Sequence, residues 1–66
     1  MREVETWVVS TTVAVDVFEK GGRWYASAPT TPGSQDTFVL VSATDRRTAT
    51  YTALVEAGWL QPRRHP

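Results

Sequence analysis

The feature that most constrains the fold is an alternation of side chains between Thr6 and Phe18. One parity of this segment is apolar except at Thr11. Its apolar members are Trp7, Val9, Val13, Val15 and Val17. A period of two with β-branched residues predicts a β-strand. Because such a strand would be roughly 43 Å long, we expect a bend or bulge near Ser10 to Thr12, or an overhang that offers a pairing edge.

Turn-forming residues separate this segment from two further expected strands. Gly21-Gly22 supplies two residues that adopt positive φ, as a tight hairpin requires. The second strand is expected from Arg23 to Ala28 and the third from Thr37 to Val41. Between them, Thr31-Pro32-Gly33-Ser34 fits a type II turn.

A single helix is expected after the third strand. Ser42 and Thr44 are both N-cap candidates, and Asp45 is favourable in a first turn. The segment continues to Ala57 without Gly or Pro, and Gly58 provides a C-terminal stop.

The residues after this stop leave two alternatives open. Trp59 and Leu60 either fold back as the hydrophobic contact of the helix cap or begin a short terminal strand. Residues 62–66 are expected to form a mobile tail. The predicted fold is therefore one small α+β domain spanning residues 1–66, with a three-stranded antiparallel sheet followed by one helix packed on it (β-β-β-α, with or without a short last strand).

Size and composition favour a partner. The chain has 66 residues, 41% of them hydrophobic, and a domain this small usually needs a disulfide, a metal or oligomerisation. It has no Cys and one His, which excludes a disulfide and a zinc ligand set. The remaining stabiliser is a partner, either a second copy of the chain or another molecule.

Charge and hydropathy indicate where the protein is located in the cell and what class of partner it binds. Seven basic residues balance seven acidic ones, which disfavours a general nucleic-acid binder. The longest apolar runs, Phe38 to Val41 and Ala53 to Val55, are far shorter than a membrane span. No secretory signal pattern opens the sequence. We expect a cytoplasmic protein that does not associate with membranes.

The sequence contains no recognisable set of residues arranged for catalysis. His65, the only histidine, is the penultimate residue, where a general base would not be preorganised. The carboxylates show neither paired nor metal-ligand spacing, and Gly21-Gly22 lacks the context of a phosphate-binding loop. The sequence thus predicts no enzyme activity, no catalytic residue, no metal and no cofactor.

Aromatic and arginine residues are the candidates for binding. Tyr25 has the opposite parity to Trp24, so it faces outward if Trp24 faces the core, and Arg23 lies beside it. Arg46 and Arg47 lie in the first helical turn, where the helix dipole disfavours cations unless an anion meets them. The expected partner-binding residues are Arg23, Tyr25, Trp7, Arg46 and Arg47. The alternatives are a core role for Trp7 and solvated arginines.

Between Phe18 and Gly33, a strand, a glycine turn, a second strand with an aromatic-Ala pair and a Pro-x-x-Pro-Gly motif follow one another. In this order they resemble the N-terminal domain of HicB-like antitoxins. The resemblance implies a β-β-β-α-β unit, related to the ribonuclease H fold but without its catalysis, that covers a small toxin ribonuclease. The helix start Asp45-Arg46-Arg47 departs from that family, and nothing matches its DNA-binding module.

Two functional hypotheses result. The first is a small non-enzymatic intracellular protein that covers or inhibits a protein partner, antitoxin-like or inhibitor-like, by pairing through a β edge, with a homodimer expected. The second is a nucleic-acid-binding domain that lays its three-stranded sheet on DNA. Its expected three strands and one helix, with Gly22-Arg23-Trp24 in a hairpin, are also similar to the arm-binding domains of phage-type integrases. The phosphate contacts would then be Arg23, Arg46, Arg47, Arg63 and Arg64.

Overall fold

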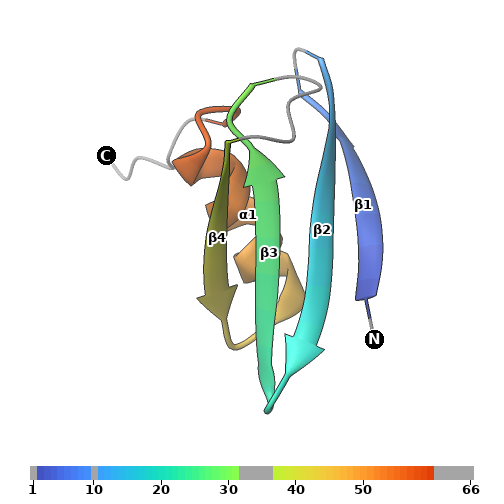
Figure 1. The fold of residues 1–66 in the computed structure, drawn as a ribbon, viewed down its shortest axis with the longest axis vertical. Helices are drawn as coiled ribbons and strands as arrows, with labels where there is room; N and C mark the ends of the chain where they lie inside the picture. The colour runs from blue at the N-terminus through green and yellow to red at the C-terminus, as the bar shows by residue number, and fades with distance from the viewer. Residues whose placement is uncertain (1, 10, 32–36, 61–66) are drawn as a thin grey trace, which may run out of the picture.

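A computed structural model describes residues 2–9, 11–31 and 37–60, which form a four-stranded antiparallel sheet with one helix on one face (Figure 1). The elements are β1 (Arg2–Val8), β2 (Thr12–Lys20), β3 (Arg23–Pro29), β4 (Phe38–Ala43) and α1 (Arg46–Glu56). The strands lie in the order β1-β2-β3-β4. The α+β class is confirmed, but the sheet has one strand more than expected.

The extra strand comes from the segment expected to be one long strand. Instead of one bent or overhanging strand, the segment forms two antiparallel strands, and Trp7 of β1 pairs with Val13 of β2. The amide of Val9 donates to the carbonyl oxygen of Thr11 at 2.9 Å in this turn. Paired residues of β1 and β2 have the same parity. The odd-numbered side chains of both strands therefore share a face, and the alternation continues through the turn unbroken.

The β2–β3 hairpin is confirmed. Lys20 pairs with Arg23, and Gly21 and Gly22 between them have φ of 60° and 80°. Two positive φ angles in a two-residue loop are characteristic of a type I′ turn. The third expected strand is β4, shifted from Thr37–Val41 to Phe38–Ala43. Most of the expected turn at residues 31–34 lies outside the described residues.

Asp45 is the N-cap of α1, so the expectation of Ser42 or Thr44 is wrong. Asp45 has extended backbone angles, and its carboxylate accepts hydrogen bonds from the amide of Thr48 at 2.9 Å and its hydroxyl at 2.7 Å. These bonds satisfy one of the free amides of the first turn and hold the pKa of Asp45 below its ordinary value. Ser42 instead belongs to β4.

The helix ends in a Schellman motif. Gly58, with φ of 94°, donates to the carbonyl oxygen of Val55 at 3.0 Å, and Trp59 donates to that of Leu54 at 2.9 Å. Trp59 and Leu60 fold back against the core, and the indole N–H of Trp59 donates to the carbonyl oxygen of Pro29 at 2.6 Å. Among residues 57–60 no strand follows the helix. The tail expected at 62–66 lies outside the described residues.

The core lies between α1 and one face of the sheet. Its buried apolar residues are Val13, Val15, Val17, Ala26, Ala28, Ala43, Ala49, Ala53 and Leu54. The many alanines let α1 approach the sheet closely. In Figure 1 the helix lies behind β3 and β4; it reaches β2 but does not pack on β1. One face of β1 and the whole opposite face of the sheet are therefore left without a helix.

Candidate functional site

The sheet face opposite α1, called the open face below, is covered by no described element. It consists of the even-numbered residues of β1, β2 and β4 and the odd-numbered residues of β3. The most exposed large hydrophobic side chains all lie on it: Val4 (61% exposed), Val8 (78%), Phe38 (59%) and Leu40 (58%). Two of them lie on each edge strand, and the aromatic residues Phe18 and Tyr25 lie between them on β2 and β3. Apolar side chains therefore recur across the whole face, which is typical of an interaction surface.

An aromatic pair occupies the middle strands of the open face. The rings of Phe18 on β2 and Tyr25 on β3 stack with centroids 5.1 Å apart and an interplanar angle of 11°. Arg23 lies on the same face and donates to the hydroxyl of Ser42 on β4 at 3.2 Å. The structure therefore places both Arg23 and Tyr25 on the outward side of β3, while Trp24 packs against the core.

The charges of the open face are predominantly basic. Arg2 and Asp16 form an exposed ion pair at 2.9 Å, which contributes little to stability. The other charged residues of this face, Lys20 and Arg23, are cations that flank the β2–β3 turn. The open face is thus apolar with a basic end.

Arg46 lies on the other side of the sheet, at the start of α1, and its anions come from β1. Its guanidinium forms an ion pair with Glu3 at 3.0 Å and a second one with Glu5, and it lies 5.8 Å from the ring centre of Trp24. The indole N–H of Trp7 also donates to Glu5, at 3.0 Å. Arg46, a cation that the helix dipole disfavours at this position, is therefore paired with carboxylates of the same chain.

The pKa of Glu5 reflects these contacts. Partial burial raises the pKa, but the hydrogen bonds from Arg46 and Trp7 together with the charge of Arg46 outweigh it and bring the pKa of Glu5 below its ordinary value. The same hydrogen bond from Arg46 to Glu5 raises the pKa of the guanidinium. This ion-pair cluster links α1 to the one strand on which the helix does not pack.

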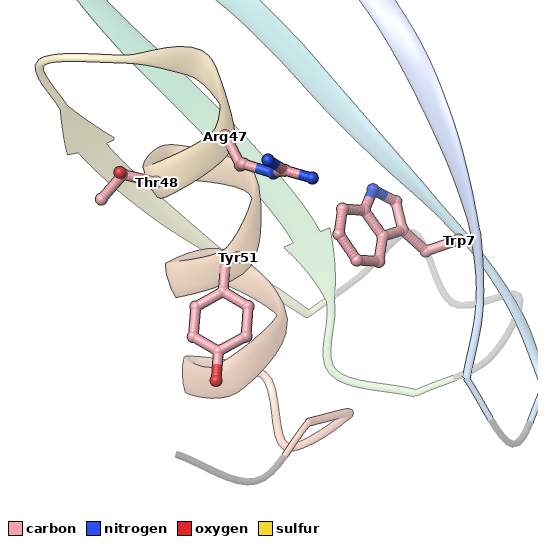
Figure 2. A pocket seen from close by; sticks show the side chains of 4 residues that line it. All are labelled: Trp7, Arg47, Thr48 and Tyr51. Carbon is pink, nitrogen blue, oxygen red and sulfur yellow. The ribbon is translucent and has the colours of Figure 1, made fainter. Parts of the chain in front are cut away.

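A groove of about 600 Å³ lies between β1 and α1. It is lined by Trp7 from β1 and by Arg47, Thr48 and Tyr51 from the helix (Figure 2). Figure 2 shows the guanidinium of Arg47 extending toward the indole of Trp7. Sequence reasoning selected Trp7 and Arg47 but not Thr48 and Tyr51, although Tyr51 follows Arg47 by four residues and so shares its side of the helix.

The expected binding residues divide between two faces. Arg23 and Tyr25 lie on the open face, whereas Trp7, Arg46 and Arg47 lie on the helix side of the sheet. The described arginines of the expected phosphate contacts are accordingly split between these faces, and Arg63 and Arg64 lie outside the described residues. The large apolar residues of the open face were missed, although Val8 and Phe18 on the second parity of the alternation signalled a second partly apolar face.

The described ranges show few signs of other site types. They contain no cluster of three or more His, Cys, Asp or Glu side chains that could hold a metal ion. Within the same ranges, α1 is too short and too polar to cross a bilayer, and there is no other helix. Comparison with protein-family models, with curated proteins and with solved structures found no match to this chain.

Proposed function

We propose that this protein is a small, non-enzymatic intracellular binding protein whose open face covers a protein partner. The supporting observation is the position of Val4, Val8, Phe38 and Leu40, all exposed and all on the open face. At about 25 cal/mol per Å², covering such side chains is a substantial driving force for association. The antitoxin-like or inhibitor-like role suggested by the Phe18–Gly33 resemblance is of this kind.

The chemistry of the open face specifies the partner. Its exposed apolar side chains on β1 and β4 call for an apolar surface, and its basic end, at Lys20 and Arg23, calls for acidic side chains beside that surface. Tyr25 offers the partner an aromatic edge with a polar tip, a type enriched at interfaces. We therefore expect a protein with an apolar patch rimmed by Asp or Glu.

Nucleic acid is the alternative occupant of the same face. Lys20 and Arg23 could meet phosphates, but the exposed valines, Phe38 and Leu40 would face a polar, charged backbone. Arg46, which an extended phosphate track would need, is engaged by Glu3 and Glu5 on the opposite side of the sheet. These contacts favour the protein partner.

The test begins with a photoreactive amino acid in place of Val8, which crosslinks and identifies the protein that covers the open face in the native host. Binding of that purified protein is then measured by calorimetry for the wild type, Val4→Glu, Arg23→Glu and the control Glu56→Gln, which changes an exposed helix residue. We expect a negative heat-capacity change, at least roughly tenfold weaker binding of the two open-face variants, and an unchanged control.

Two results would refute the proposal. One is a Val4→Glu variant that folds, as judged by circular dichroism, and binds the crosslinked protein as tightly as the wild type. The other is wild-type binding to duplex DNA that weakens steeply with salt and is lost in Arg23→Glu, which would assign the open face to nucleic acid.

A further inference from the structure

The two edge strands of the sheet differ in how they are protected. The sheet ends at β1 on one side and at β4 on the other. β1 carries Arg2, Glu3 and Glu5, and charges of this kind discourage pairing with another chain. β4, with the sequence FVLVSA, has no charge, no Pro and no Gly. An uncharged edge rich in β-branched and aromatic residues is a template for another strand.

The backbone of β4 carries hydrogen-bonding groups on its outer side, where no other described strand pairs with it. The amide of Thr30 donates to the carbonyl oxygen of Thr37 at 3.1 Å, so this pair belongs to the hydrogen-bonded class. Hydrogen-bonded pairs alternate along an antiparallel ladder, and the register then makes Val39 and Val41 the residues bonded to β3. Phe38, Leu40 and Ser42 consequently direct their N–H and C=O groups away from β3. Among the described residues, no backbone hydrogen bond of a loop or turn involves these groups.

We infer that β4 pairs antiparallel with β4 of a second copy of this chain, about a two-fold axis at Leu40. Leu40 then lies opposite Leu40 of the partner subunit, and Phe38 lies opposite Ser42 of the partner subunit. Each of these pairs exchanges backbone hydrogen bonds, and the two four-stranded sheets become one continuous sheet.

The strand that pairs with β4 comes from a second copy of the chain because this edge complements itself. Pairing about a two-fold axis brings the same uncharged sequence against itself, so no like charges meet. Phe38 and Leu40, both more than half exposed, join the same residues of the partner in one apolar cluster across the new strand pair. An acidic or basic peptide would find no countercharge on β4.

The register follows from the faces of the sheet. A shift by one residue would place open-face side chains opposite residues that face the helix. Among the remaining registers, the axis at Leu40 keeps Phe38, Leu40 and Ser42 all within the hydrogen-bonded pairing. The side chains of the partner then continue the open face.

The inference goes beyond the proposed function and does not rest on it. The dimer uses the β4 edge, whereas the protein partner is expected over the sheet face that includes Val4 on the far strand. A Val4→Glu variant should therefore remain dimeric even where it no longer binds the partner, so that either proposal can fail without the other.

The first experiment measures the oligomeric state of the full chain by sedimentation from about 1 to 500 µM, a range that covers weak interfaces. We expect a monomer–dimer equilibrium for the wild type. Leu40→Pro removes only an outward N–H, which an edge strand tolerates, and should weaken the dimer on the order of 10- to 100-fold. The control Leu40→Ala keeps that N–H and should weaken it less.

A second experiment keeps the inference testable if Leu40→Pro fails to fold. Leu40→Lys and Leu40→Glu each place like charges opposite one another across the axis and should be monomeric, whereas their equimolar mixture should form a heterodimer. A wild type that stays monomeric at 500 µM would overturn the inference. A Leu40→Pro variant that dimerises like the wild type, or a mixture that stays monomeric while Leu40→Ala dimerises, would also overturn it.

Discussion

Replacing Leu54 by Ala is the most direct test of how this small core is built. Leu54 is fully buried and is the largest such side chain among the described residues. Its three outer carbons contribute about 0.8 kcal/mol each by burial, or roughly 2.4 kcal/mol in total. The neighbouring core is mostly Val and Ala, whose short side chains cannot extend into the space left behind, so a cavity penalty adds to this value. We expect Leu54→Ala to lower the free energy of unfolding by about 3 kcal/mol.

That loss is large for a chain of this size. At roughly 0.05–0.15 kcal/mol per residue, 66 residues give a free energy of unfolding of about 3–10 kcal/mol. Urea unfolding followed by tryptophan fluorescence, with a slope of about 1 kcal/mol per molar, should show the midpoint fall by about 3 M. All variants are compared at one low protein concentration, since dimerisation adds apparent stability.

The matched control is Val8→Ala, which also removes apolar carbons but from the open face. Val8 is largely exposed, and we expect a change within about 0.5 kcal/mol. The reasoning is refuted if Leu54→Ala costs less than about 1 kcal/mol, or if the two variants lose similar stability, because burial under α1 would then not determine the cost.

Two further predictions concern Glu5 on β1 and Gly58 at the end of α1. The folded pKa of Glu5 is lower than that of an unperturbed Glu, chiefly through its hydrogen bond from Arg46. The stability that this contact contributes is therefore complete above the ordinary pKa of Glu and is lost as the pH falls through the folded pKa. Glu5→Gln should show a flatter loss of stability in acid urea titrations, and an unchanged slope would contradict this. In Gly58→Ala the added Cβ would meet no atom within 4 Å, but it would lie on a residue with φ of 94°. Backbone strain alone should therefore lower the free energy of unfolding by about 1–2 kcal/mol. An unchanged urea midpoint would show that this strain is absent.

The elements set by local chemistry were predictable from the sequence. Gly21-Gly22 specified the β2–β3 hairpin, because few other residues adopt two successive positive φ angles. The parity of Trp24 and Tyr25 placed them on opposite faces of β3. Gly58 ended the helix in the expected way, although the N-cap was Asp45, whose carboxylate reaches the amide of Thr48.

The N-terminal hairpin was not predictable by the same means. No Gly, Pro, Asn or Asp marks the reversal between Val8 and Thr12. Since the pairing joins residues of equal parity, a hairpin and one long strand produce the same alternation. Only the excess length of that strand indicated that something interrupts it.

The candidate sites depended on contacts between distant segments. Glu3 and Glu5 meet Arg46 across some forty residues of sequence, which no local pattern specifies. The open face is likewise a property of the topology. Val4 and Leu40 are exposed because α1, the one helix among the described residues, packs on the other side of the sheet. A sequence pattern alone does not say which of two partly apolar faces is covered.

The size of α1 relative to the sheet explains why surfaces remain to be covered. The 11 helical residues form a rod about 16 Å long and about 10 Å wide, while four strands span roughly 19 Å. One helix therefore covers about half the width of one face, which leaves the groove beside Trp7 and the entire open face. The proposed pairing at β4 would widen the sheet and bring Phe38 and Leu40 into contact with their counterparts, while Val4 and Val8 on β1 would stay exposed. The proposed dimer would therefore leave most of each open face accessible and would present two adjoining open faces to a protein partner.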